Sequence, residues 1–226
     1  MAGTLCIDFD DTLVEGEIFE CIMDAFAAPR WRDLREERRA GRMTVEELCA
    51  AALDLVEADE SELRAMAREV AKPRAGLMEL TDWAHWNGWN VAVVSNGFDF
   101  YIDPVLDALG LERVSRHCGR TRFAYRWRVS YVSPRGVELQ SGFKVSYASA
   151  YKQAGDFVAW VGDGDGDVAP AGESDAVFAR GRLWDTLKDG HARIYPFETF
   201  HDVTAVLDRE GARWLESFSS TTVVEG

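Results

Sequence analysis

Short apolar runs alternate with amphipathic stretches along most of the chain. The runs at residues 4–7, 91–94, 157–161 and 176–179 are β-prone and apolar throughout, which is typical of strands buried on both faces of a parallel sheet. Between the later runs, apolar residues recur at helical spacing. This alternation predicts an α/β fold in which helices cover both faces of a parallel sheet.

A long block after the first strand has a different pattern. Residues 15–72 show helical periodicity only, and Thr44 precedes Glu47 at the spacing of a capping box. Because the block interrupts the chain between the first strand and all the others, we interpret it as an inserted cap. The predicted organisation is a catalytic core made of residues 1–14 and 73–226, with a helical cap at 15–72.

Two segments outside this alternation also have a readable pattern. Residues 121–141 are predicted to form a β-hairpin around a turn at residues 134–136, whose sequence is Pro-Arg-Gly. The last helix is expected from Phe200 to Trp214, and the final ten residues, 217–226, are expected to be a frayed tail.

Composition narrows the range of functions. The 226 residues include 25 Lys and Arg against 39 Asp and Glu, which gives a formal net charge of −14, and 47% of the chain is hydrophobic. Such a chain has enough apolar residues to fold. Its acidity argues against binding nucleic acid, because a phosphate backbone requires a basic surface. A small anionic substrate remains compatible if a metal ion or local cations offset the charge.

Targeting and cysteine patterns indicate a cytoplasmic protein with reduced thiols. The N-terminus has no basic start followed by an apolar stretch of signal-peptide length. No apolar run approaches the roughly 18 residues of a membrane helix. The four cysteines form no C-x-x-C pair, so a structural zinc site is not expected. Cys6 and Cys49 are predicted to be small buried hydrophobic residues.

Polar clusters follow three of the predicted strands. Asp8 and Asp10 come after the first strand, Ser95-Asn96 after the second, and the segment 163–167 after a later one. In an open parallel sheet, ligands bind beyond the carboxyl ends of the strands. Carboxylates that converge there repel one another unless a hard cation such as Mg²⁺ binds them. Lys144, at the start of a predicted helix, would add a second positive charge.

Each cluster on its own has a simpler explanation. Ser95 and Asn96 suit a helix N-cap and turn. The segment beginning at Asp163 looks like the start of a calcium loop, but its twelfth position is Ser174 and not the required Glu. Lys144 alone would be a solvated lysine. The functional interpretation therefore depends on the clusters occurring together and in order.

That order resembles the haloacid dehalogenase superfamily of phosphotransferases. Residues 8–13 (Asp-Phe-Asp-Asp-Thr-Leu) resemble its first motif, Ser95-Asn96-Gly97 its second, Lys144 its third, and Gly162-Asp163-Gly164-x-x-Asp167 its fourth. The resemblance spans essentially the whole chain and implies a Rossmann-like parallel-sheet core with a small C1-type helical cap. The sequence looks like the branch that contains phosphoserine phosphatase. Three segments look most like the methionine-salvage enolphosphate phosphatases and the phosphocholine/phosphoethanolamine phosphatases: 167–171, 175–180 and 196–200.

The resemblance implies a role for each motif residue. Asp8 matches the nucleophile that forms an aspartyl-phosphate, and Asp10 matches the general acid and base. The residues that match Mg²⁺ ligands are Asp8, Asp10 through its backbone carbonyl, Asp163 and Asp167. The residues that match phosphate-binding groups are Ser95, Asn96 and Lys144. The family pattern commonly has Gly at the position of Asp11 and Asn or Ser at that of Gly166, with Asp165 as an additional acid; these departures concern the metal site and substrate contacts.

Substrate choice is expected to depend on the cap. Its basic stretch includes Arg42, which we consider as a substrate-binding residue; the simpler explanation is a solvated helix face with ion pairs. The expected function is Mg²⁺-dependent hydrolysis of a small phosphorylated metabolite. An enolphosphate, phosphoserine and an amino-alcohol phosphate all remain open as substrates, and the oligomeric state is left open. The alternatives are a phosphotransferase or mutase with the same nucleophile, and a non-enzymatic phospho-receiver domain.

Overall fold

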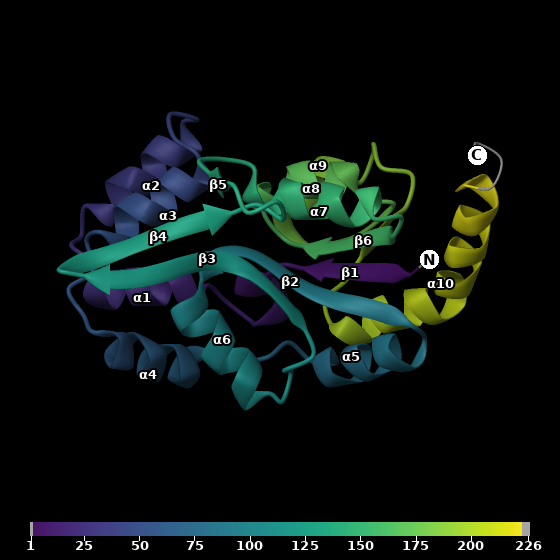
Figure 1. Cartoon of the computed structure of the whole chain (residues 1–226), viewed down its shortest axis with the longest axis horizontal. Helices are drawn as coiled ribbons and strands as arrows, with labels where there is room; N and C mark the ends of the chain where they lie inside the picture. Colours follow the sequence, from purple (N-terminus) through teal and green to yellow (C-terminus); the bar gives the residue numbers. More distant parts are fainter. Residues whose placement is uncertain (1, 223–226) are drawn as a thin grey trace. The chain divides into compact units, whose positions relative to one another are not determined.

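The structure of the chain is a computed structural model that describes residues 2–222, with side chains as far as Phe218. The strands of the described chain form one sheet in the order β5-β4-β3-β2-β1-β6-β7-β8 (Figure 1). The strands are β1 (Gly3–Ile7), β2 (Trp89–Phe98), β3 (Ser115–Ala124), β4 (Arg126–Val132), β5 (Glu138–Leu139), β6 (Phe157–Gly162), β7 (Ala176–Ala179) and β8 (Ile194–Pro196).

Helices connect these strands. They are α1 (Ile18–Phe26), α2 (Trp31–Arg39), α3 (Val45–Leu53), α4 (Glu60–Val70), α5 (Leu77–Trp86), α6 (Asp99–Ala108), α7 (Phe143–Gln153), α8 (Val168–Glu173), α9 (Gly181–Leu187) and α10 (Phe200–Thr222), with short helical turns η1 (Phe9–Leu13) and η2 (Asp165–Asp167). The predicted fold class, α/β with a mostly parallel sheet, a helical insert after the first strand and a β-hairpin, is confirmed.

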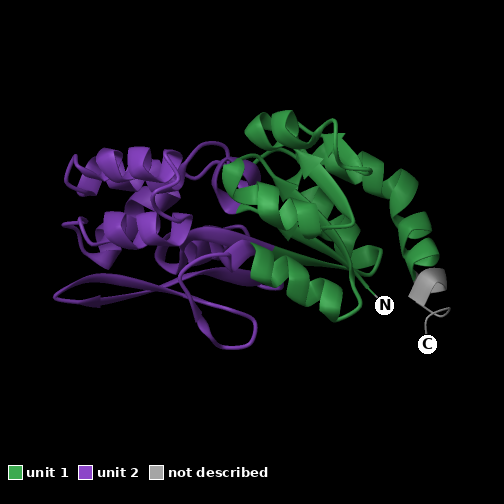
Figure 2. Cartoon of the chain, turned by 90° about the horizontal axis from the view of Figure 1, so that it is seen from above, with its two compact units in different colours: residues 1–8, 73–92, 145–226 green, residues 9–72, 93–144 purple. Residues whose placement is uncertain are grey.

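The chain divides into two compact units, coloured in Figure 2. Unit 1 contains Met1–Asp8, Pro73–Ala92 and Val145–Gly226, and unit 2 contains Phe9–Lys72 and Val93–Lys144. The helical insert is thus grouped by compactness with the hairpin segment that follows β2. The division into a core of residues 1–14 and 73–226 and a cap of residues 15–72 stays a prediction.

Unit 1 is a three-layer arrangement around parallel strands. β1 pairs with β6, β6 with β7, and β7 with β8, all in parallel. Helices α7, α8 and α9 cover one face of these strands, and α5 and α10 cover the other (Figure 1). Every residue of β1, β6 and β7 is buried, as expected for strands covered on both faces. Parallel pairing brings the carboxyl ends of β1, β6 and β7 to one edge.

Unit 2 combines the helical insert with the antiparallel strands β3, β4 and β5. Helix α3 packs on β4, α6 packs on β3, and α4 packs on both α6 and α1. The predicted capping box at the start of α3 is confirmed, because Thr44 Oγ1 accepts the Glu47 N–H at 3.1 Å and Glu47 Oε2 accepts the Thr44 N–H at 2.8 Å. Large aromatic side chains fill the core of unit 2, including Trp31, Phe98, Phe100, Tyr101 and Trp127.

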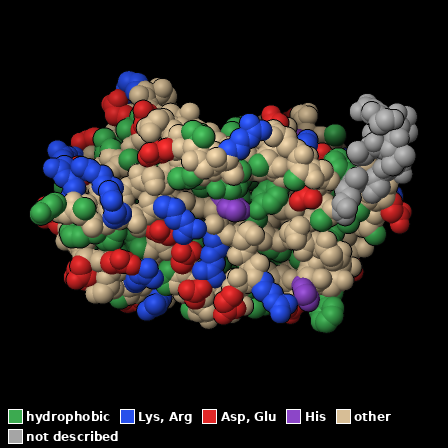
Figure 3. Space-filling model, in the orientation of Figure 1, with side chains coloured by type: hydrophobic (Ala, Val, Ile, Leu, Met, Phe, Trp, Pro, Cys, Tyr) green, Lys and Arg blue, Asp and Glu red, His purple; other side chains and the backbone are tan. Residues whose placement is uncertain are grey.

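Charged side chains of the hairpin are paired within the same unit. Lys and Arg side chains gather near the tip of the β3–β4 hairpin, at the left of Figure 3. Arg126 and Arg128 each form an ion pair with Asp54, the residue that follows α3, at 3.0 and 2.7 Å. These pairs join the hairpin to the helical insert, and exposed pairs of this kind contribute little stability.

The structure differs from the sequence prediction in four places. β2 does not end at residue 94 but continues to Phe98, so that Ser95 and Asn96 lie within the strand. The hairpin turns at Tyr125, which has a left-handed φ of 64°, and residues 134–136 form a second turn before β5. Strand β8 was not predicted. Helix α10 extends through Thr222, which includes residues 217–222 of the predicted tail; the rest of that tail, 223–226, lies outside the described residues.

The cysteines fit a further expectation. Cys6 and Cys49 are buried as predicted, Cys118 is buried too, and Cys21 is exposed; all four thiols are free. Across residues 2–222, no helix is both long enough and apolar enough to span a membrane.

Candidate active site

The end of β1 positions Asp8 beside β6. The register pairs Ile7 with Val161, and the Asp8 N–H donates to the Val161 carbonyl at 3.0 Å. The ladder therefore continues one residue past β1 and places Asp8 at the carboxyl edge of unit 1, where β6 leads into Asp163. Asp8 is only 8% exposed. A carboxylate this buried requires compensation by hydrogen bonds or a cation.

Three carboxylates meet at this edge, as the sequence analysis predicted. One ligand atom from each of Asp8, Asp163 and Asp167 lies within 4.8 Å of the others. Three anions so close together repel one another, and oxygen-rich clusters of this type are what Mg²⁺ and Ca²⁺ bind. The donor set therefore fits the predicted Mg²⁺. The assignment of Asp8, Asp10, Asp163 and Asp167 as metal ligands stays a prediction.

Asp167 is fixed in place by three donors. Its Oδ1 accepts the Trp160 indole N–H at 3.1 Å, and its Oδ2 accepts the backbone N–H groups of Asp163 and Gly164 at 3.1 and 3.2 Å. Gly162 makes room for this side chain, since a Cβ at that position would lie 2.5 Å from the Asp167 Cγ. The glycine at this position of the fourth motif is therefore explained by packing.

Asp10 lies in unit 2 and its carboxylate accepts three hydrogen bonds. Oδ1 accepts the N–H groups of Ile18 and Phe19 at 2.7 and 3.3 Å, and Oδ2 accepts the hydroxyl proton of Tyr101 at 2.7 Å. Removal from water raises the Asp10 pKa above its usual value, although these hydrogen bonds and the charge of Lys144 lower it. A raised pKa suits a carboxyl group that must hold a proton before it donates it.

A tight turn separates Asp10 from α1. Asp11 has φ 47° and ψ 7°, in the left-handed region, and it closes the turn with two bonds to Gly16. The Asp11 N–H donates to the Gly16 carbonyl at 2.8 Å, and Asp11 Oδ1 accepts the Gly16 N–H at 3.2 Å. Aspartate tolerates this conformation better than most residues other than glycine, so Asp11 suits a position where the family commonly has glycine.

Ser95 and Asn96 are buried in unit 2 near the end of β2. Ser95 Oγ accepts the Gly97 N–H at 3.0 Å, and the Asn96 carbonyl accepts the hydroxyl proton of Tyr131. The Asn96 side-chain Nδ2 is buried and has no hydrogen-bond acceptor among residues 2–218. A buried donor without an acceptor is costly, and an anionic oxygen would satisfy it. Phosphate binding by Ser95 and Asn96 stays a prediction that this geometry fits.

Lys144 is the second residue of α7 and is only 6% exposed. Its ammonium lowers the pKa of Asp10, which shows that the two charges interact within unit 2. A buried ammonium is costly unless it is compensated by anions. Because Lys144 is buried, it is not a solvated surface lysine. Its contact with phosphate stays a prediction.

Arg42 has an ion-pair partner on the helical insert. Its Nε and Nη2 donate to the two carboxylate oxygens of Glu37 at 2.5 and 2.8 Å, and its side chain is 60% exposed. Asp165, the additional acid of the fourth motif, pairs with Arg182 at 3.1 Å. The geometry at Arg42 fits the simpler explanation, a solvated ion pair, and its role in substrate binding stays a prediction.

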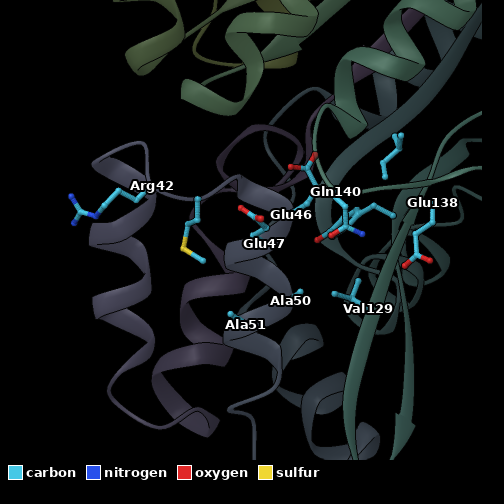
Figure 4. Close-up of a pocket in the computed structure, with 11 residues that line it drawn as sticks. Arg42, Glu46, Glu47, Ala50, Ala51, Val129, Glu138 and Gln140 are labelled. Carbon is cyan, nitrogen blue, oxygen red and sulfur yellow. The ribbon is translucent and has the colours of Figure 1, made fainter.

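A pocket of about 490 Å³ opens between α3 and the β4–β5 strands of unit 2. Its lining residues are Arg42, Met43, Glu46, Glu47, Ala50, Ala51, Val129, Tyr131, Glu138, Leu139 and Gln140. Figure 4 shows the Arg42 side chain extending away from Val129 and Glu138 on the opposite wall. The lining of the pocket thus combines apolar side chains with the carboxylates of Glu46, Glu47 and Glu138. Its wall includes Tyr131, which is one hydrogen bond from Asn96.

Two tyrosine hydroxyls in this region were missed by sequence reasoning. Tyr101 lies in α6 and Tyr131 in β4, both rings are buried, and neither residue belongs to one of the four sequence motifs. Their hydroxyls bond to Asp10 and Asn96, which are 91 and 35 residues away along the chain. The hydroxyl itself was the available clue, because a buried tyrosine O–H requires a partner.

Comparisons with known proteins give a consistent result. A family model described as haloacid dehalogenase-like hydrolase matches residues 5–171. A protein of Bacillus thuringiensis subsp. konkukian (strain 97-27), named 2-hydroxy-3-keto-5-methylthiopentenyl-1-phosphate phosphatase, is 27% identical over 205 residues, which cover 88% of this chain and 93% of that protein. A protein of the same name from Bacillus cereus (strain AH820) is 28% identical with the same coverage.

Solved structures show the same fold. A phosphoserine phosphatase described as a phospho-aspartyl intermediate analogue superposes with a TM-score of 0.67 at 18% identity, covering 91% of this chain and 98% of its own.

Proposed function

Because the chain belongs to the haloacid dehalogenase-like hydrolase family and is a phosphatase that acts on a small phosphorylated metabolite, we propose that it hydrolyses a phosphomonoester through an aspartyl-phosphate on Asp8. The observation that carries this proposal is the cluster of Asp8, Asp163 and Asp167 at one edge of the sheet. Asp8 alone of the three directly follows β1, two residues before a second acid, Asp10.

The first step transfers the phosphoryl group to the enzyme. A carboxylate oxygen of Asp8 attacks phosphorus, an Asp8 O–P bond forms, and the bond from phosphorus to the substrate oxygen breaks. Asp10 gives its proton to that oxygen, so that the product leaves as a neutral hydroxyl compound. General acid catalysis of this kind typically contributes about 10²–10⁴-fold.

The second step regenerates Asp8. Asp10, now ionised, takes a proton from a water molecule whose oxygen attacks phosphorus. The Asp8 O–P bond breaks, inorganic phosphate leaves, and Asp10 is again protonated. The two carboxyls therefore need different environments, and they have them: Asp8 belongs to the carboxylate cluster, whereas Asp10 has a raised pKa in the turn before α1.

Positive charge and hydrogen-bond donors are required around the transferred group. Bound by Asp8, Asp163 and Asp167, Mg²⁺ would neutralise the carboxylates and the phosphoryl oxygens. In our proposal, Ser95, the Asn96 amide and Lys144, all in unit 2, donate to the substrate phosphate. These groups favour a charge that spreads over the phosphoryl group in the transition state.

For the substrate, we propose the enolphosphate of methionine salvage, 2-hydroxy-3-keto-5-methylthiopentenyl-1-phosphate. Relatives that bear this name align with 88% of the chain. The pocket beside α3 fits a substrate with an apolar end, because Met43, Ala50 and Leu139 line it. A methylthio group would be removed from water there.

An amino-alcohol phosphate is the second candidate substrate, and one observation favours it. Three carboxylates line the same pocket, Glu46, Glu47 and Glu138, whereas the Arg42 guanidinium is already paired with Glu37. An ammonium group would be attracted to these carboxylates, and a substrate carboxylate would be repelled by them. The pocket therefore favours both candidates over phosphoserine.

The test is release of inorganic phosphate by the purified protein from each of the three substrates, with added Mg²⁺. We expect the enolphosphate to give the highest kcat/KM and Asp8→Asn to be inactive on every substrate. Glu138→Gln separates the two candidates, because it should lower kcat/KM only for the amino-alcohol phosphate. Full activity of Asp8→Asn would refute the covalent mechanism.

The alternative of phosphoryl transfer to another acceptor has a direct test. A phosphotransferase or mutase would phosphorylate an added alcohol, whereas a hydrolase releases all of the phosphate to water. The non-enzymatic phospho-receiver alternative is set aside, because the relatives and the structural neighbours are phosphatases. Location in the cytoplasm stays a prediction.

A further inference from the structure

The hydroxyl of Tyr101 makes a contact that the family motifs do not include. Tyr101 is the third residue of α6, and its side chain is fully buried. It donates to Asp10 Oδ2 at 2.7 Å, within unit 2. Side chains in the first turn of a helix point back toward its N-terminus, and in α6 that direction is the end of β2, where Ser95 and Asn96 lie.

The donors around Asp10 leave little freedom for its proton. A carboxylate offers about four acceptor positions, two on each oxygen. Among the described residues, Ile18 and Phe19 take those on Oδ1, and Tyr101 takes one on Oδ2. The remaining position is therefore on Oδ2, and Tyr101 determines which direction it faces.

Gly97 leaves room for this hydroxyl because it has no side chain. A Cβ on Gly97 would lie 2.0 Å from the Tyr101 hydroxyl oxygen and 2.7 Å from the ring carbon that bears it. Both distances are impossible for real atoms, so a side chain at residue 97 would displace Tyr101. The glycine of the second motif is required here by the tyrosine, because its backbone is not in the left-handed region that favours glycine.

Aromatic neighbours hold the Tyr101 ring. The ring centroids of Phe9, Phe98 and Phe100 lie 5.8, 6.0 and 5.5 Å from that of Tyr101, in tilted or edge-on contacts. Such geometries are the favoured ones for aromatic pairs. Phe9 is the residue between the two catalytic acids of the proposal, so the ring also packs against the segment that carries them.

We propose that Tyr101 is a positioning residue for Asp10 and that Gly97 is required to admit its hydroxyl. This inference rests on the proposed function, in which Asp10 gives its proton to the leaving oxygen. Tyr101 directs the free position of Oδ2, and hence the proton, without touching the substrate. Its loss therefore matters most when the leaving oxygen most needs a proton.

Two aryl phosphates of nearly equal shape make that dependence measurable. The nitro group of p-nitrophenyl phosphate stabilises the departing anion, so this substrate needs little help from an acid. Phenyl phosphate lacks that group and depends more on proton donation. The ratio of kcat/KM for phenyl phosphate to kcat/KM for p-nitrophenyl phosphate therefore reports the acid function, since kcat/KM covers the step in which the leaving group departs.

Tyr101→Phe keeps the ring and removes only the hydroxyl. We expect it to lower the ratio by about tenfold, in line with the loss of a hydrogen bond to an ionisable group. Tyr131→Phe is the matched control, because it also removes one buried hydroxyl but frees the Asn96 carbonyl. It should lower both kcat/KM values equally and leave the ratio unchanged. Circular dichroism and thermal unfolding check that both variants fold.

Gly97→Ala tests the second half of the inference. It should lower the ratio as Tyr101→Phe does, because the added Cβ displaces the hydroxyl. In a Tyr101→Phe background the same substitution should change the ratio by less than twofold, since the two changes act on one contact and are not additive. A ratio that Gly97→Ala leaves unchanged in the parent chain overturns the role of Gly97.

Asp10→Asn, measured beside the others, distinguishes a failure of the positioning role of Tyr101 from a failure of the acid role of Asp10. We expect it to lower the ratio more than Tyr101→Phe. If Asp10→Asn shifts the ratio and Tyr101→Phe does not, the positioning role of Tyr101 is wrong and the proposed function stands. If neither variant shifts it, the acid role of Asp10 is wrong, and the inference about Tyr101 fails with it.

Discussion

The indole N–H of Trp160 donates to Asp167 Oδ1 at 3.1 Å, between two side chains that are both almost completely buried. Trp160 lies in β6, two residues before the strand ends, and its hydrogen bond reaches forward to the short helical turn after the strand. The other Asp167 oxygen accepts two backbone N–H groups. Hydrogen bonds to both carboxylate oxygens therefore fix the Asp167 side chain before any cation binds.

We predict that Trp160→Phe weakens Mg²⁺ binding. Partners that orient a metal ligand typically change affinity by about 10–100-fold when they are removed, and we expect a loss of about tenfold. The measurement is calorimetric Mg²⁺ titration of the folded protein. Trp83→Phe is the control, because it removes an indole N–H from Asp208 at 2.9 Å, on helices away from the carboxylate cluster. Equal Mg²⁺ affinities in the two variants would contradict the prediction.

Metal removal should stop turnover. Without a cation, the carboxylates of the cluster repel one another and the substrate phosphate. Chelation is expected to abolish phosphate release, and added Mg²⁺ should restore it. Asp163→Asn should raise the Mg²⁺ concentration needed for half-maximal activity by about tenfold or more. Asp165→Asn, which loses only the ion pair with Arg182, should leave it within about twofold. A chelated enzyme with full activity would show that the metal assignment is wrong.

Asn96→Ala should weaken the binding of phosphate itself. The Asn96 Nδ2 is buried without an acceptor among residues 2–218, and a phosphate oxygen would supply one. Loss of a hydrogen bond to a charged group costs about 1.5–3 kcal/mol, so the inhibition constant of inorganic phosphate should rise by roughly tenfold or more. Asn87→Ala, an exposed asparagine that bonds to the Trp83 carbonyl, is the control. An unchanged inhibition constant would leave Asn96 with a structural role only.

Asp202 should stabilise the fold in a pH-dependent way. Its Oδ2 accepts the N–H groups of Glu198 and Thr199 at 3.0 and 2.9 Å, and these bonds lower its pKa below the usual 3.8. A lowered folded pKa gives stability that is present above the unfolded value and is lost as the pH falls through the folded value. Asp202→Ala should cost about 1 kcal/mol near neutral pH.

Urea unfolding at several pH values measures this effect. The gap between the parent chain and Asp202→Ala should be constant from about pH 7 to pH 5 and should narrow below about pH 4, where the carboxylate is protonated in the unfolded chain. A gap that does not change with pH would mean that Asp202 acts through packing and not through its charge.

Sequence patterns located Asp8 and Asp163 because both follow continuous apolar runs. Such runs are long enough to be identified as buried strands, and parallel pairing then brings their carboxyl ends together. The capping box at Thr44 was predictable for a similar reason, since its partners are three residues apart. Information that lies within one short segment of sequence was sufficient in each of these cases.

Contacts between distant segments were not predictable in this way. The bond from Tyr101 to Asp10 joins residues 91 positions apart, and the local pattern of α6 indicates a buried ring but not the partner of its hydroxyl. The hairpin was expected to turn at residues 134–136, where Pro and Gly are typical turn residues, but the first turn is at Tyr125. A tyrosine at φ 64° is uncommon, so the pairing of β3 with β4 imposes this turn against the preference of the residue.

The uneven exposure of the four thiols determines how the protein responds to oxidants and alkylating reagents. Burial raises the pKa values of Cys49 and Cys118 to about 12 and that of Cys6 further still, so these thiols stay protonated and unreactive. Cys21 alone of the four is exposed, and a single accessible thiol can form a disulfide only with another molecule. Partial burial and the nearby charges of Asp10, Asp24 and Glu20 raise its pKa as well. A maleimide label would therefore attach at one position, slowly at neutral pH, and Cys21→Ser would protect stored protein against covalent dimers.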